Sequence, residues 1–157
     1  MPTAVSSPEI GGALDPNRDQ QFLNNFDVSG NASFKGSATC YGATGGLGYS
    51  TGSGGSVTQI TSKSTGVTLS TLSGQITMNN ASLANATGVA FTVTNTLIAA
   101  NDCPNVVILS GATANTYLVC IGAVAAGSFV VNLYNYSGSS QTDAIVLQFD
   151  IIRGAKI

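Results

Sequence analysis

The residues of this chain that could do chemistry are few, and none of them is a histidine. Without histidine, a hydrolase would have to activate its nucleophile with a carboxylate, a lysine or the amino terminus. Asp143 and Asp150 lie seven residues apart in one predicted strand, so their side chains should face opposite sides of the sheet. The two carboxylates of a glycosidase must flank one glycosidic bond, and side chains on opposite faces of a strand are poorly placed to do so. We expect Asp150 to be a solvated or hydrogen-bonded strand residue.

Asp102 is the only charged residue between Ser64 and Thr142. Catalysis or calcium binding at this carboxylate is one interpretation. A turn is the preferred one, because Asn101, Asp102 and Pro104 are residue types that favour turns. We therefore expect no catalytic residue and no metal site, and we expect that the chain is not an enzyme.

The three cysteines, Cys40, Cys103 and Cys120, are odd in number and lack the spacing of a metal site. Reduced and mostly buried thiols are the preferred interpretation, and a Cys103–Cys120 disulfide is left open. The glycine-rich stretch from Gly42 to Ser56 predicts a flexible connection. A phosphate cradle would need a following Gly-Lys-Ser or Gly-Lys-Thr and a helix, so we expect no nucleotide and no other cofactor.

Charged residues make up only 8% of the chain, against about 25% in ordinary soluble proteins. The net charge of -2 is too small to predict binding to nucleic acid or to an acidic membrane surface. Met1 to Ser7 has no basic start and no apolar run, so we expect no signal peptide. The apolar stretch from Tyr117 to Val131 is too short for a membrane span. This composition favours a subunit of an assembly.

Beyond the glycine-rich stretch the hydrophobic period is two, which predicts an all-β fold. The predicted strands are Val57 to Thr61, Gly66 to Leu69, Gln75 to Asn79, Val89 to Asn95, Val106 to Ser110, Thr116 to Val124, Ser128 to Tyr136 and Asp143 to Ile152. Eight strands with one apolar face each suit a two-sheet antiparallel sandwich of jelly-roll type.

The strand from Thr116 to Val124 is exceptional because both of its faces are apolar. Tyr117, Val119 and Ile121 lie opposite Leu118, Cys120 and Val124. Such a strand should be central in its sheet or covered by another subunit. We predict an oligomer interface here, formed by Tyr117, Leu118, Val119 and Ile121.

The N-terminal part differs in composition from the rest of the chain. Residues 1–26 predict an extended arm, and a small hairpin is expected between Phe26 and Gly36. The expected organisation is an arm with hairpin over residues 1–41, a connection over 42–56 and a β-sandwich oligomerisation domain over 57–157. The proposed apolar anchors of the arm are Val5, Ile10, Leu14, Phe22 and Phe26.

The string GYSTGSGGSVTQITSKSTGVTLSTLSGQITMNN, from Gly48 to Asn80, precedes the strand VAFTVTN and the closing AIVLQFDIIRG. With these segments the chain resembles small virion proteins of tailed bacteriophages, which include head-decoration proteins and tail-fibre domains. The resemblance covers roughly residues 48–154. It implies an oligomeric β-sandwich with no catalytic residues to transfer to this chain.

The leading functional hypothesis is therefore a capsid cement or head-decoration protein, located in the virion and assembled in the host cytoplasm. Its expected partners are the major capsid protein, bound by the arm, and further copies of itself, with a homotrimer expected. The alternative is a short tail-fibre or receptor-binding tip that contacts host glycans. Tyr134, Tyr136 and Asn132 are the candidates for such contacts, because aromatic and amide groups together can bind sugars. Tyrosines beside a turn also commonly just cover a sheet edge.

Overall fold

The computed structural model describes residue 37, residues 46–50 and residues 52–155, and its regular structure consists of eight β-strands. Each of the eight predicted strands overlaps one observed strand, so the period-two interpretation is confirmed. The strands are β1 (Ser56–Thr58), β2 (Val67–Thr68), β3 (Ser73–Thr77), β4 (Thr87–Thr94), β5 (Cys103–Ser110), β6 (Tyr117–Ala125), β7 (Ser128–Asn135) and β8 (Val146–Ile152).

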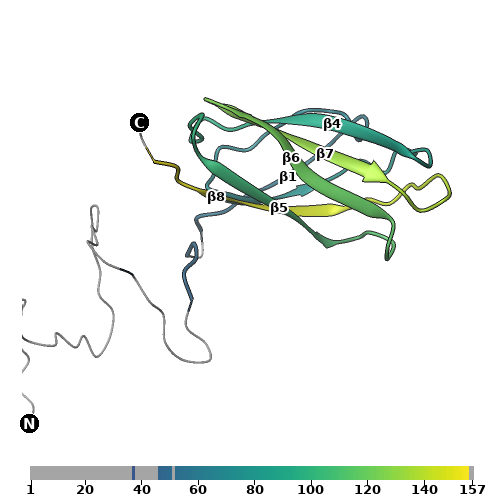
Figure 1. The fold of residues 1–157 in the computed structure, drawn as a ribbon, viewed down its shortest axis with the longest axis horizontal. Coiled ribbons are helices and arrows are strands. Elements are labelled where there is room, and N and C mark those ends of the chain that lie inside the picture. Colours follow the sequence, from purple (N-terminus) through teal and green to yellow (C-terminus); the bar gives the residue numbers. More distant parts are fainter. Residues whose placement is uncertain (1–36, 38–45, 51, 156–157) are drawn as a thin grey trace, which may run out of the picture. The chain divides into compact units, whose positions relative to one another are not determined.

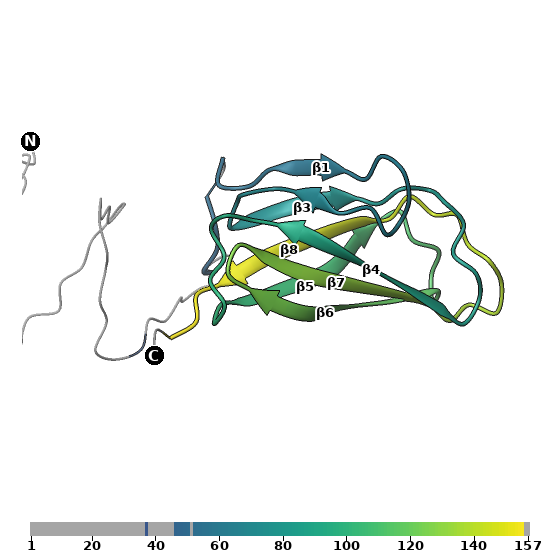
Figure 2. The same ribbon diagram turned by 90° about the horizontal axis from the view of Figure 1, so that it is seen from above.

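The strands form two four-stranded sheets that pack face to face as a sandwich (Figures 1 and 2). Sheet A has the order β1-β3-β8-β5, and sheet B has the order β2-β4-β7-β6. Strands β1 and β3 pair in parallel, as do β2 and β4, whereas the other pairs are antiparallel. The prediction of a purely antiparallel, jelly-roll-like sandwich is therefore wrong: the sheets are mixed. The reason is that β1 and β2 each reach a parallel neighbour by crossing to the other sheet in between, so no hairpin joins the pairs.

The core lies between the two sheets and is built by the inward-facing residues of each strand. Sheet A contributes Ile76, Leu147, Phe149 and Ile151, and sheet B contributes Phe91, Val93, Phe129, Val131 and Leu133. The rings of Phe129 and Phe149 meet across the interface, with centroids 5.4 Å apart and planes inclined by 60°. Burial of one such side chain contributes roughly 1.5–3 kcal/mol, so these rows hold the sheets together.

Strand β6 lies at the edge of sheet B, not at its centre. The prediction of a central strand is therefore wrong, and the alternative of a strand covered by another subunit stays a prediction. A register shift between Ile121 and Ala123 also turns Val124 inward, where it packs against the core. The expectation that Val124 shares a face with Leu118 is wrong for this reason, because a bulge inserts one residue and reverses the alternation.

Buried amides fix the loops at the ends of the sandwich. The side-chain nitrogen of Asn135 donates to the carbonyls of Leu83, Ala84 and Ser139, and its oxygen accepts from Ser137. Because Asn135 is fully buried, these bonds also meet the requirement that buried polar groups find partners.

Several predictions for the N-terminal part lie outside the described residues: the arm, its anchors Val5, Ile10, Leu14, Phe22 and Phe26, and the hairpin between Phe26 and Gly36. Within the glycine-rich connection, residues 46–50 and 52–55 contain no strand, and β1 begins at Ser56. Residues Gly46–Ile157 group as one unit.

Candidate functional site

Asp102, the carboxylate singled out by the sequence, holds the C-terminal segment against a turn. The turn closes through the Asp102 amide, which donates to the Ala99 carbonyl, so the preferred interpretation of this position is confirmed. The carboxylate accepts hydrogen bonds from the amides of Ala99 and Gly154 and from Arg153, at 2.9, 3.0 and 2.7 Å. These bonds, the Ala99 amide first, lower the pKa of Asp102. These contacts join the turn to the C-terminal segment.

A second charged group, Lys63, is buried at the far end of the sheets. Its ammonium donates to the backbone carbonyls of Asn79 and Asp143, at 2.7 and 2.5 Å. Burial lowers the pKa of Lys63, and the negative charge of Asp143 opposes this effect. Two carbonyl acceptors hold the side chain in place, so Lys63 ties the loop before β8 to the end of β3.

Tyr117 neighbours the carboxylate of Asp143, and its buried hydroxyl has no hydrogen-bond partner within the described part of the chain. Burial first, and then the charge of Asp143 and a polar contact with its carboxyl, raise the pKa of Tyr117 to about 12. That contact does not reach hydrogen-bond geometry, whereas the Asp143 carboxyl accepts a regular bond of 2.8 Å from the Thr113 amide. Asp143 precedes β8 and Asp150 lies within it, so the structure does not bring the two carboxylates together as a pair.

The described cysteines are free thiols on the surface. Cys103 begins β5, and Cys120 lies in the middle of β6, with both side chains exposed and unbonded. The expectation of mostly buried thiols is wrong for these two, because both occupy outward positions of edge strands. The open question of a Cys103–Cys120 disulfide is answered in the negative. Among the described residues no cluster of His, Cys, Asp and Glu side chains could bind a metal ion.

The surface most distinct from an ordinary protein exterior is the outer face of sheet B. Across β4, β7 and β6 the outward residues pair in rows such as Ala90, Asn132 and Cys120, and Gly88, Tyr134 and Leu118. No outward residue of these three strands is charged. Leu118 exposes 61% of its surface and Tyr134 exposes 41%. A shallow groove of about 260 Å³ is lined by these two side chains together with Gly88, Ala90, Cys120 and Asn132.

Two glycines shape this groove by making room for polar and aromatic side chains. A Cβ at Gly88 would lie 3.3 Å from the Tyr134 ring, and a Cβ at Gly122 would lie 2.5 Å from the Asn132 amide nitrogen. The structure therefore brings Asn132 and Tyr134, which the sequence singled out, to one groove. Tyr136 follows the end of β7 and does not line it. Sequence reasoning missed Gly88 and Gly122. Their place beside Tyr134 and Asn132 depends on the pairing of strands that are distant in sequence.

Of the four predicted interface residues, one lies on this outer face. Leu118 points outward, whereas Tyr117 is buried and exposes only 7% of its surface. Val119 and Ile121 are half-buried and pack against the core. The alternation along β6 thus turns three of the four predicted interface side chains inward, and the interface itself stays a prediction.

The free edge of β6 distinguishes it from the other three edge strands. Strands β1 and β2 have three and two residues, and β5 carries Pro104, whereas β6 has nine residues with no charge and no proline. Short length and proline are devices that protect sheet edges from pairing with other chains. No strand of the described part pairs with the free side of β6, and only the bulge at Gly122 interrupts it.

The part of the chain that the structure describes contains no helix able to cross a membrane.

Comparisons with known proteins give no relative from which a function could be transferred. No protein-family model matches the chain, and neither a curated protein nor a solved structure is significantly similar to it.

Proposed function

We propose that this chain is a non-enzymatic structural protein of a virion, a capsid cement or head-decoration protein that assembles through strand β6 and the outer face of sheet B. The observation that carries the proposal is a long, uncharged edge strand, interrupted by the bulge at Gly122, beside an uncharged sheet face. A permanent interface needs roughly 800 Å² or more from each partner and is more apolar than ordinary surface. This face offers the composition that such an interface requires.

The charged groups support a structural role in a second way. Asp102, Arg153 and Lys63 are occupied with hydrogen bonds that fix the ends of the sandwich. None of them is arranged as an acid, a base or a nucleophile toward an open site. The proposed division of labour is that the sandwich oligomerises, as a trimer, while the N-terminal arm binds the major capsid protein.

The assembly is tested by light scattering on the purified full chain and two variants. Leu118→Asp places a charge on the proposed interface, and Ile60→Asp changes an even more exposed apolar residue elsewhere, with 86% of its surface exposed. We expect the wild type and Ile60→Asp to be oligomers and Leu118→Asp to have the 15.8 kDa mass of a monomer. A monomeric wild type, or equal effects of the two variants, contradicts the assembly surface.

The capsid part of the proposal needs a separate experiment. Removal of residues 1–26 should abolish co-sedimentation with capsids. The number of subunits in the oligomer should stay the same. Undiminished binding of the shortened chain would show that the arm is not the attachment segment. The alternative role, a tip that contacts host glycans, predicts retention on sugars in place of capsids.

A further inference from the structure

The outer face of sheet A carries amide, hydroxyl and carboxylate groups, beside exposed apolar side chains on β5 and at the end of β8. Gln75 of β3 lies opposite Gln148 of β8, and in the next row Ser73 lies opposite Asp150. Asp150 in turn lies opposite Asn105 of β5. Neighbouring strands are about 4.8 Å apart and successive outward residues about 6.6 Å apart, so these groups form a small two-dimensional field.

A hollow covers this field where the segment before β1 passes over the sheet. One part, of about 350 Å³, is lined by Tyr49, Ser50, Ser73, Gln75 and Gln148 together with glycines of the segment. A second part, of about 420 Å³, shares Tyr49 and Ser73 and extends to Asn105 and Asp150, with the apolar side chains of Leu47 and Ile152 also in its lining. Volumes of this size are typical of small-molecule sites.

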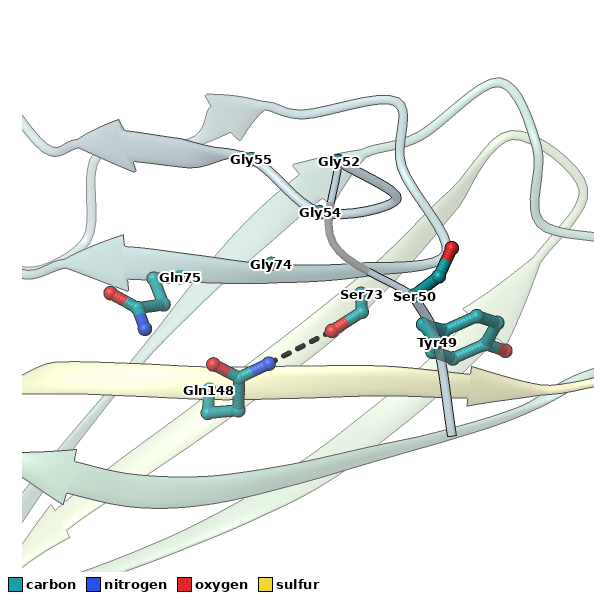
Figure 3. A pocket seen from close by; sticks show the side chains of 9 residues that line it. All are labelled: Tyr49, Ser50, Gly52, Gly54, Gly55, Ser73, Gly74, Gln75 and Gln148. Carbon is teal, nitrogen blue, oxygen red and sulfur yellow. Dashed lines mark hydrogen bonds between the residues drawn. The ribbon is translucent and has the colours of Figure 1, made fainter. Parts of the chain in front are cut away.

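The ring of Tyr49 stands at one end of the hollow, and the Gln75 amide at the other, with Gln148 and Ser73 between them (Figure 3). The Tyr49 hydroxyl donates to the Ile151 carbonyl, which fixes the ring at the sheet while 43% of the residue stays exposed. The Gln148 amide nitrogen donates to Ser73 Oγ at 2.9 Å, which orients that amide. The site is thus a fixed aromatic surface beside oriented polar groups.

The polar groups favour a ligand whose own groups both donate and accept. The side chains of Gln75, Asn105 and Asp150 make no hydrogen bond to the described part of the chain, and the oxygen of the Gln148 amide is also unused. Amides offer donors and acceptors side by side, and a carboxylate accepts, which matches hydroxyl groups. Hydroxyls arranged around a ring, with a C–H face for an aromatic side chain, are the chemistry of a saccharide.

The charges near the hollow argue against an anionic ligand. Asp150 lies in its lining, and the described cations, Lys63 and Arg153, are engaged by carbonyls and by Asp102. A peptide strand would need a free sheet edge. Here β3 and β8 are the central strands of sheet A, so their backbone groups are already paired and only side chains face the ligand.

We propose that the hollow between Tyr49, Gln75, Gln148 and Asp150 binds a neutral saccharide. This inference does not depend on the assembly role, because the hollow and strand β6 belong to different sheets.

Binding is tested with the full chain and a panel of neutral oligosaccharides: maltohexaose, cellohexaose and the hexamer of N-acetylglucosamine. Saturation-transfer NMR detects contact, and calorimetry measures affinity. We expect at least one of them to bind with a dissociation constant of about 0.1–1 mM, as suits an open site. Tyr49→Ala and Gln75→Ala should each weaken binding about tenfold or more, which corresponds to about 1.4 kcal/mol.

Matched controls separate this site from the groove on sheet B and from the assembly. Tyr136→Ala and Asn80→Ala remove exposed side chains of the same kinds elsewhere and should leave affinity unchanged. Leu118→Asp should leave it unchanged as well, even where it alters the oligomer. Absence of binding across the panel overturns the proposal, as does loss of binding in Tyr136→Ala. Preference for a sulfated oligosaccharide over its neutral form also overturns it.

Discussion

The buried hydroxyl of Tyr117 gives a sharp test of the structure, because none of the described residues forms a hydrogen bond with it. At a site with a good partner, Tyr→Phe removes a bond that contributes about 1 kcal/mol and destabilises the protein. Here the substitution removes a hydroxyl whose desolvation is not compensated, a penalty of about 1–3 kcal/mol. The polar contact with Asp143 offsets part of it, so we expect Tyr117→Phe to increase the free energy of unfolding by about 1 kcal/mol.

Such a gain should raise the melting temperature by about 3–5 °C for a domain of this size. Urea denaturation at pH 7 measures the free energy, and calorimetry measures the melting temperature. Tyr136→Phe is the matched control, since it removes an exposed hydroxyl and should change stability by less than about 0.5 kcal/mol.

The pH dependence of the same variant provides an independent check. The pKa of Tyr117 is raised to about 12 in the folded protein, against about 10 in the unfolded chain. Ionisation of this tyrosine therefore does not affect the stability of the wild type below pH 10, and it lowers that stability as the pH rises toward 12. Tyr117→Phe has no such loss, so its advantage should grow above pH 10. A variant less stable than the wild type by about 1 kcal/mol at pH 7 would refute the reasoning and show that the hydroxyl is bonded to Asp143.

Four further substitutions test the ends of the sandwich. Because the pKa of Asp102 is lowered, its contribution is present above about pH 4 and is lost as the pH falls through the lower folded value, so Asp102→Asn should be less stable than wild type at pH 7 but equal to it near pH 2 in urea denaturation. The lowered pKa of Lys63 means that the unfolded chain binds more protons below about pH 10.4, so wild-type stability should rise as the pH approaches that value, and Lys63→Met should not show this rise. Gly111 and Gly127 both have positive φ, at 76° and 83°, but only at Gly111 would a Cβ meet backbone, 2.4 Å from the Ala144 oxygen. Gly127→Ala should therefore cost about 1 kcal/mol, and Gly111→Ala about 1–3 kcal/mol more, while equal losses would contradict the close approach.

The strands were predictable because their signal is local. In β8 the alternation of Leu147, Phe149 and Ile151 with more polar residues fixes both the strand and its buried face. The same alternation made β4 and β7 recognisable. A signal that repeats every second residue needs no knowledge of the rest of the chain.

The pairing of the strands was not predictable, because it depends on distant partners. Nothing in the sequence of β1 or β2 distinguishes a parallel neighbour from an antiparallel one. The composition of β6 is that of a strand buried on both faces, yet it lies at an edge with its outer face uncovered in this chain. The apolar composition of β6 predicts a covered strand, and the described part of the chain does not cover its outer face.

The site around Tyr49 was missed for a related reason. Its segment is rich in glycine and serine, a composition that predicts a flexible connection, and Tyr49 alone does not change that prediction. The hydrogen bond that places the ring reaches Ile151, at the far end of the chain. Lys63 is a parallel case, since the carbonyls that hold it belong to Asn79 and Asp143.

The two outer faces of the sandwich differ in a way that the core cannot explain. Inward residues of both sheets are apolar, because both serve the same core. Outward residues are free of that requirement. Those of sheet B include Leu118 and Tyr134 and no charge, whereas those of sheet A combine exposed apolar side chains on β5 and at Ile152 with Gln75, Gln148 and Asp150. The proposals assign another protein surface to sheet B and a hydroxyl-rich ligand to the polar part of sheet A. Loss of oligomers without loss of sugar binding in Leu118→Asp, and the reverse in Tyr49→Ala, is the combination of results that this separation requires.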